Sequence, residues 1–575
     1  MKILLTTLNA KFIHSSLALA YLNAYCQADF NDLHIREYTI NEPQAKIMAD
    51  IYCLKPDVVC FSCYIWNMDL IKDICSNLKQ VLPDIKIIVG GPEVTYDAPT
   101  LLQENQAVDY VIRGEGEETL YELLYCLQQE VIPQQVSGLT YRHDLITANN
   151  DRPLINHLDK IPFPYEEENI GNYNNRVIYY ETSRGCPFNC SYCLSSTTRG
   201  VRYFSLERVF KDLKFLIDHQ VPEVKFVDRT FNCNEKRSIE IMSFIMQNNI
   251  KTKFHFEIDA TLLTNEFLAF LRIVPSGVFD FEIGVQSTYP KALCSVNRNS
   301  DWIKLRENIS YLLLNCKIHI HLDLIAGLPY EDFERFKISF NDVYNLKPHV
   351  IQLGFLKLLK GSLIRTESND HNYKFEPKPP YQVLENDYIS YEDMLKLVQV
   401  EDLVSRYYNT GIVSNCLSYI IDQLYMNNAF AFWQDYADFL NDRNYFRFGH
   451  RREEEYTFLY DFIARYPENR IIIGELIKLD YFLNNQSSNL PAAFSRNNPD
   501  NINEILYSFL KDEDFIALNM PVLINKTPRE RRRIVHMEYL LLDVNFSAAK
   551  EPVPFIFIYD STSKRAASVV IAHFI

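Results

Sequence analysis

Three cysteines on one short stretch are the residues whose type and spacing most clearly indicate chemistry in this sequence. Cys186, Cys190 and Cys193 stand in the order C-x3-C-x2-C, and Tyr192 directly precedes the last one. Cysteine thiolates bind iron, and a 4Fe-4S cluster normally takes four of them. Three cysteines would leave one iron without a protein ligand. The spacing therefore predicts a 4Fe-4S cluster with one coordination position open to another molecule.

Two other interpretations of the cysteine loop are available from its residues. The three thiols could be buried close together by chance, or they could bind zinc. A zinc site normally needs a fourth Cys or His at a recognisable spacing. The nearest later candidate, Cys233, follows forty residues on and has no paired ligand beside it. The sequence therefore favours the iron–sulfur cluster.

The cysteine loop follows the first strand of a predicted series of alternating strands and helices. This strand covers residues 177–183, and helical stretches separate it from five more strands. We predict these at 223–228, 253–259, 280–287, 317–329 and 349–358. Six such units fit an open, partial (β/α)6 barrel over residues 176–375. Ligand-binding residues of barrels gather at the carboxyl ends of the strands, where the cysteine loop would lie.

The cysteine loop and the barrel resemble the radical S-adenosylmethionine (radical SAM) superfamily over about residues 175–370. That family has a partial barrel of this kind, with the cluster loop after the first strand. The resemblance implies that the methionine end of S-adenosylmethionine chelates the open iron. It further implies that the reduced cluster cleaves this cofactor to methionine and a 5′-deoxyadenosyl radical, which abstracts a hydrogen from substrate. The protein would orient and shield the cofactors.

Polar residues at the predicted carboxyl ends of the barrel strands are candidates for binding S-adenosylmethionine. Arginine suits a carboxylate by its two-pronged geometry, and Asp or Gln suits ribose hydroxyls as an acceptor. The set resembles that of members related to the coproporphyrinogen dehydrogenase type, although residues 228–230 lack the glycines of a frequent family motif. Alternatively, the carboxylates could form structural ion pairs. The candidates are Tyr192, Asp228, Thr230, Glu257, Glu282, Gln286, Arg298 and Asp323.

Residues 1–130 also alternate strands and helices, which predicts a doubly wound, Rossmann-like α/β domain. Residues 57–66 are almost continuously apolar, as in a buried parallel strand. Cys60 and Cys63 are three positions apart on it and would face opposite sides, so we expect core thiols. Residues 131–175 are expected to form a linker with a small hairpin.

From residue 376 to 575 the sequence predicts a mixed, mostly helical C-terminal domain. Two apolar stretches, 515–525 and 554–560, are predicted as late strands. The basic run at 529–533 is expected to be a solvated surface segment. By overall layout, the chain resembles cobalamin-domain radical SAM proteins that end in a domain of unknown function.

The N-terminal domain resembles the cobalamin-binding domain of cobalamin-dependent radical enzymes, many of which are methyltransferases. Glycine turns allow backbone to approach a flat ligand closely. The histidine signature D-x-H-x-x-G of many cobalamin proteins is missing, because Asp32 and His34 begin it but residue 37 is Glu. His34 lies in a predicted strand, so the cobalt would lack a histidine as lower ligand. The residues that would line the corrin ring are Ser62, Tyr64, Gly90, Gly91, Glu93, Gly114 and Gly116.

Composition narrows the partners and the location that we expect. The formal net charge of −16 argues against non-specific binding of nucleic acids, which usually needs a basic face. No stretch reaches the ~18 consecutive apolar residues of a membrane span, and the N-terminus lacks the features of a signal peptide. A cytoplasmic protein is expected, in which the thirteen cysteines are no disulfide framework.

These features predict an enzyme that generates a 5′-deoxyadenosyl radical, in the first place a cobalamin-dependent methyltransferase acting on an unknown substrate. An electron donor such as flavodoxin or ferredoxin would reduce the cluster. A cobalamin-dependent radical cyclase or rearrangement enzyme fits the same parts. A methylthiotransferase would need a second cysteine cluster and an RNA-binding β-barrel, and neither is evident. A non-enzymatic alternative is a cobalamin or redox sensor with a vestigial barrel.

Overall fold

The computed structural model describes all of the chain except residues 168, 199, 250, 487–488, 561–564 and 572–575. The described residues form two compact units. The first holds the N-terminal sheet and the barrel, and the second holds most of the C-terminal helices and a small sheet. The first unit comprises Met1–Ser339 and Leu353–Met394, and the second comprises Phe340–Gln352 and Leu395–Ile575.

The N-terminal domain is a seven-stranded sheet in the order β2-β1-β3-β4-β5-β6-β7. The strands β1 to β5 are parallel, and β6 and β7 form an antiparallel hairpin at the edge. The strands are β1 (Ile3–Asn9), β2 (Leu33–Thr39), β3 (Val58–Ser62), β4 (Lys86–Gly90), β5 (Tyr110–Ile112), β6 (Leu139–Arg142) and β7 (Ile146–Ala148). The predicted doubly wound domain is thereby confirmed.

Helices cover both faces of this sheet and enclose two apolar cores. Leu4 of β1 lies in the core of α2, α3 and α5, whereas its neighbours Ile3 and Leu5 lie in the core of α1 and α6. Ser16 caps α1, because its side chain accepts a hydrogen bond from the amide of Leu19. The helices are α1 (Leu17–Cys26), α2 (Gln44–Leu54), α3 (Met68–Val81), α4 (Pro92–Thr95), α5 (Ala98–Glu104) and α6 (Glu117–Gln128).

The predicted partial barrel is also confirmed, as a six-stranded sheet in the order β15-β14-β13-β12-β11-β8. Along β12, Phe254, Phe256 and Ile258 are buried, while the alternate residues His255 and Glu257 are only half-buried and line the inner face. The strands are β8 (Ile178–Tyr180), β11 (Glu223–Phe226), β12 (Lys253–Ile258), β13 (Phe279–Gln286), β14 (His319–Ala326) and β15 (Val350–Phe355).

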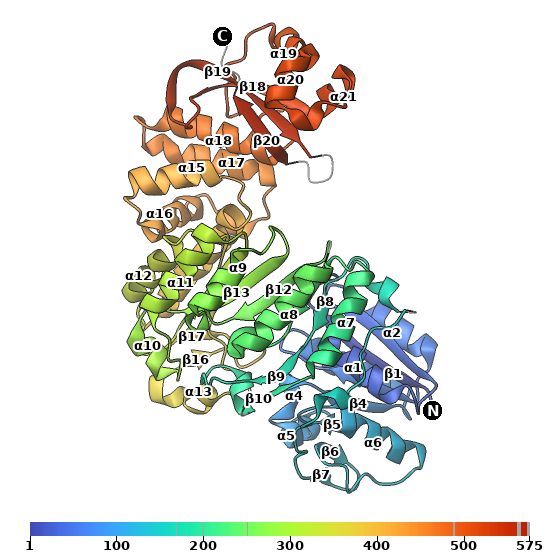
Figure 1. Ribbon diagram of the computed structural model, residues 1–575. Helices are drawn as coiled ribbons and strands as arrows, with labels where there is room; N and C mark the ends of the chain where they lie inside the picture. Colours follow the sequence, from blue (N-terminus) through green and yellow to red (C-terminus); the bar gives the residue numbers. More distant parts are fainter. Residues whose placement is uncertain (168, 199, 250, 487–488, 561–564, 572–575) are drawn as a thin grey trace. The chain divides into compact units, whose positions relative to one another are not determined.

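Amphipathic helices pack on the outer, apolar face of the barrel strands. Figure 1 shows two of them, α7 and α8, side by side against the sheet. The helices are α7 (Leu206–Asp218), α8 (Glu235–Asn248), α9 (Asn265–Leu271), α10 (Pro290–Ser295), α11 (Trp302–Asn315) and α12 (Phe333–Tyr344). After β15 the chain adds α13 (Leu363–Thr366) and a small ribbon of β16 (Lys374–Phe375) and β17 (Val383–Glu385).

The C-terminal part consists of helices followed by the antiparallel sheet β18-β19-β20. The helices are α14 (Tyr391–Leu403), α15 (Ser414–Tyr419), α16 (Ala429–Asn441), α17 (Arg452–Phe462), α18 (Arg470–Asn484), α19 (Ile502–Lys511), α20 (Glu513–Asn519) and α21 (Pro528–Arg533). The strands are β18 (Val535–Leu542), β19 (Ala548–Tyr559) and β20 (Ala566–Ile571). The predicted strand at 554–560 is confirmed within β19.

Two predictions for this part were wrong. Residues 515–525 are mainly helical, because Asp512 caps α20 and the apolar residues Ile516, Met520 and Leu523 recur at helical spacing in one core. The basic run at 529–533 is not wholly solvated. Arg531 is buried, and its guanidinium pairs with Glu513 and donates to main-chain carbonyls.

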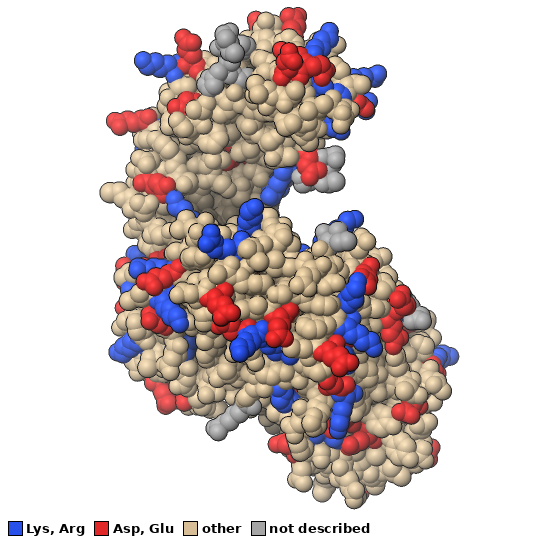
Figure 2. All heavy atoms as spheres, viewed as in Figure 1, with Lys and Arg blue, Asp and Glu red and all other residues tan. Residues whose placement is uncertain are grey.

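Charged side chains are spread over the surface. In Figure 2, acidic and basic side chains alternate over the face that is visible, and neither kind forms a large continuous area there. Within the described residues, we find no helix that is both long and apolar enough to cross a membrane.

Candidate functional site

A short antiparallel hairpin at the carboxyl end of the first barrel strand carries the cysteine loop. It pairs β9 (Ser183–Cys186) with β10 (Gly200–Tyr203), so that Cys186 lies opposite Gly200. Gly185 has φ +100°, and a Cβ atom at this position would collide with the carbonyl oxygen of Gly200. Only glycine fits there, and its tight turn sets where Cys186 lies.

Main-chain hydrogen bonds fix the rest of the cysteine loop to the barrel. The amide of Ser191 donates to the carbonyl of Val296 (2.9 Å), and the amide of Ile364 donates to the carbonyl of Ser191 (3.0 Å). Within the loop, the amide of Cys193 donates to the carbonyl of Cys190 (3.1 Å). The loop is therefore held between two segments that are far from it in sequence.

The three cysteines differ in their surroundings. Cys190 is buried, whereas Cys186 and Cys193 are half-buried. Burial raises the pKa of the Cys190 thiol, and the positive charge of Arg298, whose Nη1 lies 3.9 Å from the sulfur, opposes that rise. The Cys186 sulfur lies 3.5 Å from Oγ1 of Thr230. A nearby guanidinium favours the thiolate, which is the form that binds iron.

The donor set fits a 4Fe-4S cluster better than a single metal ion. Across the described parts of the chain, no three His, Cys, Asp or Glu side chains converge on a point that could hold one ion. A cluster does not require this convergence, because each thiolate binds a different iron. The structure also brings Cys233 toward the loop, where its sulfur lies 3.3 Å from the Tyr203 hydroxyl.

Arg298, Gln286 and Gly284 meet beside Cys190. A bulge interrupts the pairing of β13 with β14 at this point, and Gln286 adopts φ +68°. The Arg298 guanidinium donates through Nη2 to the carbonyl of Gly284. A Cβ atom on residue 284 would collide with Nε2 of Gln286 and would lie 3.5 Å from Arg298 Nη2. Gly284 therefore gives these two side chains the room that they occupy.

Several buried side-chain atoms in this region lack a hydrogen-bond partner among the residues that the structure describes, and two of them suit a ligand. These two are Arg298 Nε and Asp323 Oδ1. The Asp323 oxygen is 3.2 Å from His321 Nε2 without hydrogen-bond geometry, and burial raises the Asp323 pKa well above its ordinary value. A guanidinium N–H and a carboxyl oxygen suit a ligand that carries a carboxylate and hydroxyl groups. The methionine and ribose ends of S-adenosylmethionine have these groups.

We expect Gly284→Ala to weaken S-adenosylmethionine binding at least ~10-fold, because a misplacement of about 1 Å has large effects in a preorganised site. The added methyl would displace Gln286 and Arg298 without removing a polar group. Equilibrium dialysis with the cofactor on reconstituted protein measures the effect. Gly449→Ala is the matched control, since Gly449 has no positive φ and nothing lies within 4 Å of a Cβ atom there. Equal affinities of the two variants would contradict the assignment.

Two other predicted contacts already have protein partners. The Asp228 carboxylate accepts hydrogen bonds from the amide and the hydroxyl of Thr182 (2.9 and 2.6 Å) and from the hydroxyl of Ser183 (2.6 Å). It therefore positions the start of the cysteine hairpin. The Glu282 carboxylate accepts hydrogen bonds from His255 and Lys225. Burial disfavours the charged form of Glu282, but these hydrogen bonds outweigh the effect of burial and lower the Glu282 pKa to about 2.

Glu257 and Tyr192 lie in the same part of the barrel, but neither takes part in a comparable network of hydrogen bonds among the described residues. Glu257 pairs in register with Glu282, and burial raises the Glu257 pKa while Arg229 opposes that rise. Burial likewise raises the pKa of Tyr192, whose ring lies beside Cys190 and Arg298. The roles of these residues in binding S-adenosylmethionine stay predictions.

A cavity of about 640 Å³ lies at the carboxyl ends of the N-terminal strands, and barrel residues form part of its wall. Pockets of a few hundred Å³ or more are typical of cofactor sites. The barrel contributes Tyr179, Glu181, Arg184, Val227 and Arg229. Of the seven predicted corrin contacts, six line this cavity, namely Ser62, Tyr64, Gly90, Gly91, Gly114 and Gly116.

Glycines and stacked aromatic rings form parts of the cavity wall. A Cβ atom on Gly114 would meet nothing within 4 Å, so this glycine leaves open space in the wall. Gly91 lets α4 approach β3, since its Cβ atom would lie 2.6 Å from the Cys63 carbonyl. The rings of Tyr64 and Trp66 stack at 4.4 Å and provide an aromatic surface. These features suit a large ligand with a flat ring, such as cobalamin.

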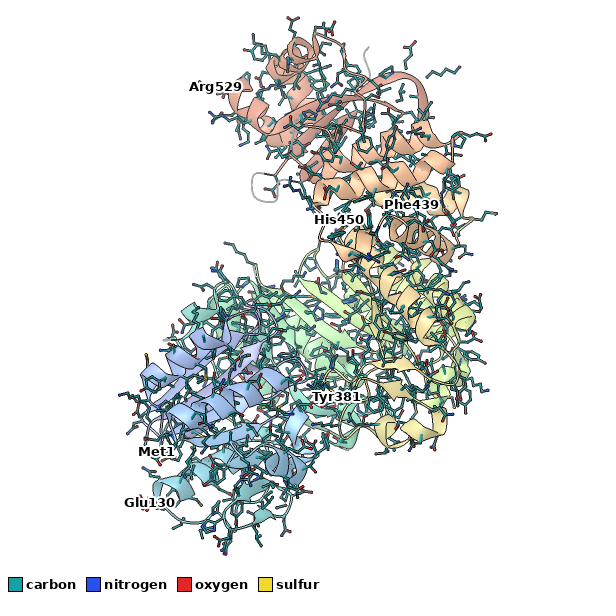
Figure 3. All side chains as sticks on the ribbon, turned by 180° about the vertical axis from the view of Figure 1, so that it is seen from behind. Met1, Glu130, Tyr381, Phe439, His450 and Arg529 are labelled. Atoms are coloured by element: carbon teal, nitrogen blue, oxygen red, sulfur yellow. The ribbon has the colours of Figure 1, made fainter. Side chains whose placement is uncertain are left out.

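The seventh predicted contact, Glu93, is buried but takes part in a different interaction. Its carboxylate lies 3.1 Å from the Nζ of Lys360 and accepts a hydrogen bond from the hydroxyl of Tyr381, which Figure 3 labels. Lys360 also pairs with Asp97 (2.8 Å). This network ties α4 to the segments that follow the last barrel strand. No pattern in the sequence predicted this network, because almost three hundred residues separate its partners.

A second charged network lies where the cavity meets the cysteine hairpin. Arg184 pairs with Glu181 (2.8 Å) and Glu117 (2.6 Å) and lies 3.4 Å from Glu115. Arg202 pairs with Glu115 (2.7 Å). Burial raises the pKa of Glu181 to about 7, although the charge of Arg184 opposes that rise. Glu181 therefore changes charge near neutral pH.

We expect Glu181→Gln to stabilise the protein more at pH 8 than at pH 5. The carboxyl loses its proton near pH 4.5 when unfolded and near pH 7 when folded. The wild type therefore loses stability as the pH rises between these values, by roughly 1–3 kcal/mol, and the Gln variant does not. Urea unfolding at both pH values measures this. The exposed Glu104→Gln is the control, and a pH-independent difference for Glu181→Gln would refute the prediction.

Three protein-family models match the chain. The B12 binding domain matches residues 3–124 and the Radical SAM superfamily matches residues 180–343. A protein of unknown function, DUF4080, matches residues 369–557.

Curated relatives include methyltransferases and a cyclase. An uncharacterized methyltransferase of Pyrococcus horikoshii is 29% identical over 45% of this chain and 58% of its own. The hopanoid C-3 methylase of Methylococcus capsulatus is 25% identical over 54% and 60%. The anaerobic magnesium-protoporphyrin IX monomethyl ester cyclase of Cereibacter sphaeroides is 24% identical over 57% and 56%. The chain thus spans less than two thirds of each relative.

Two solved structures have a similar fold. The radical S-adenosylmethionine methyltransferase TsrM from Kitasatospora setae, with cobalamin and a 4Fe-4S cluster bound, has a TM-score of 0.56 at 13% identity, covering 66% of this chain and 79% of its own. The cobalamin-dependent radical enzyme OxsB, with aqua-cobalamin and S-adenosylmethionine bound, has a TM-score of 0.57 at 15% identity, covering 83% and 79%. At these identities the likeness concerns the fold.

Proposed function

Since this chain belongs to the radical SAM superfamily, in the group with a B12-binding domain ahead of the barrel, we propose that it is a cobalamin-dependent methyltransferase. The observation that carries the proposal is the shared wall of the 640 Å³ cavity, which N-terminal strand ends and barrel residues form together. Such a wall suits an enzyme in which two cofactors act on one substrate.

The roles that we propose follow from the donor types. Cys186, Cys190 and Cys193 would hold a 4Fe-4S cluster, and the half-buried Arg298 and Asp323 would bind S-adenosylmethionine. The glycine-lined cavity would hold cobalamin. When bound, the cluster and S-adenosylmethionine supply an organic radical, and cobalamin supplies a methyl carrier. The chain's own residues orient these groups and exclude water from them.

Further parts of the proposal concern organisation and partners. We place the cobalamin-binding domain at residues 1–130, the radical SAM barrel at 176–375 and the C-terminal domain at 376–575. The linker is placed at 131–175, and its hairpin of β6 and β7 extends the edge of the N-terminal sheet. The cluster requires an external one-electron donor, such as a flavodoxin or a ferredoxin. The relatives' names include both methyltransferases and a cyclase, which makes radical cyclisation the second candidate.

Anaerobic reconstitution with iron, sulfide and hydroxocobalamin, followed by product analysis, tests the proposal. A methyltransferase supplied with reductant and S-adenosylmethionine forms both S-adenosylhomocysteine and 5′-deoxyadenosine. A cobalamin-dependent cyclase forms 5′-deoxyadenosine without S-adenosylhomocysteine, and a sensor forms neither. A preparation that retains zinc in place of iron would refute the radical chemistry itself.

A further inference from the structure

One histidine among the described residues that line the cobalamin cavity was not singled out by any motif. His14 lies in the loop between β1 and α1, beyond the carboxyl end of β1, which is an interior strand of the sheet. The histidine that begins the incomplete cobalamin signature, His34, lies instead on the edge strand β2 and pairs with Asp32 (2.8 Å). His34 is absent from the cavity wall.

Hydrogen bonds to the barrel and to β1 hold the His14 loop in place. The amide of Val177 donates to the carbonyl of Ile13 (2.8 Å), and the Ser15 hydroxyl donates to the carbonyl of Val177 (2.8 Å). The side-chain amide of Asn9 donates to the carbonyl of His14 itself (3.1 Å). Because both neighbours of His14 are anchored, its imidazole has a defined place in the wall.

The two ring nitrogens of His14 have the surroundings that a metal-ligating histidine needs. Its Nδ1 lies 2.7 Å from the Tyr179 hydroxyl. Nε2 has no hydrogen-bond partner within the part of the chain that the structure describes. A ligating histidine is neutral and typically uses one nitrogen for the metal while its other ring N–H binds an oxygen.

We propose that His14 supplies Nε2 as an axial ligand to the cobalt of cobalamin, with Tyr179 as the positioning residue that accepts a hydrogen bond from Nδ1. The inference rests on the proposed binding of cobalamin. It replaces the expectation that the cobalt lacks a histidine, which depended on a sequence signature alone. A loop after β1 can present a histidine to this cavity without that signature, because the barrel fixes the loop from the other side.

Electron paramagnetic resonance of the cob(II)alamin-loaded protein tests the assignment without relying on activity. The full-length chain is labelled with ¹⁵N-histidine and loaded with unlabelled cob(II)alamin. A histidine ligand splits the cobalt signal into doublets, whereas the cofactor's own benzimidazole nitrogen gives triplets. We expect doublets in the wild type and their loss in His14→Gln. We expect them to persist in His34→Gln, the matched control.

The possible outcomes separate the ligand assignment from the proposed function. Triplets, or lines without nitrogen splitting, in the labelled wild type would refute the role of His14 while leaving cobalamin binding intact. A wild type that binds no cobalamin, as judged by absorbance after gel filtration, would overturn both. If His14→Gln binds no cobalamin, Tyr179→Phe serves as the second variant. Because it leaves Nδ1 without its partner, it should shift the doublet spacing, and an unchanged spectrum would contradict the proposed hydrogen bond.

Discussion

Replacing Cys190 with alanine is expected to reduce 5′-deoxyadenosine formation on the order of a thousandfold or more, because losing one member of a catalytic unit has an effect of this size. Cys190 is the buried member of the cysteine loop, and Arg298 lies next to its sulfur. Without this thiolate, a second iron of the cluster would have no protein ligand. The iron content and the charge-transfer absorbance of the reconstituted protein should fall with the activity.

Cys53→Ala is the matched control for this experiment. Cys53 is an exposed cysteine on α2, far from the loop in sequence, and its removal should change neither iron content nor product formation. Cobalamin binding should be the same in Cys190→Ala, Cys53→Ala and the wild type, because neither cysteine lines the cavity. A Cys190→Ala protein that keeps a full complement of iron and forms 5′-deoxyadenosine would refute the cluster assignment.

Replacing Gly91 with alanine is expected to destabilise the N-terminal domain by about 3 kcal/mol or more and to abolish cobalamin binding. Gly91 adopts φ 110° and ψ 176°, a conformation that is essentially restricted to glycine. Its Cβ atom would also lie 2.6 Å from the main-chain oxygen of Cys63, which cannot move without breaking β3 from β4. Urea unfolding and cobalamin titration measure the two effects.

Gly114→Ala separates stability from ligand binding. Gly114 also has a positive φ, +76°, but its Cβ atom would enter open space. We expect a loss of only about 1 kcal/mol from backbone strain. The added methyl would project from the cavity wall and weaken cobalamin binding. Equal stabilities of Gly91→Ala and Gly114→Ala would contradict the prediction that the close approach of residue 91 to β3 requires glycine.

The fold class could be predicted because it depends on local patterns. A strand that is buried on both faces needs apolar residues at successive positions, and β3 meets this requirement from Val58 to Phe61. Cys60 lies in the core of α1 and α6, and Phe61 and Cys63 lie in the core of α2 and α3. The two cysteines are thus core thiols on opposite sides, as expected. In contrast, residues 515–525 have an apolar composition that suits either a helix or a strand, and they are helical because they pack against β18.

The sequence by itself determined the cysteine loop and the glycine turns, because their function depends on residues that are neighbours in the chain. Eight consecutive positions contain all three thiols. Only the tertiary structure decided which polar residues remain available to a ligand. Glu93 and Glu282 meet cations that lie far away in sequence, whereas Arg298 Nε and Asp323 Oδ1 are buried without a hydrogen-bond partner among the described residues. His14 reached the cavity wall for the same reason: its place depends on contacts with a barrel strand more than 160 residues later, and no local pattern encodes such contacts.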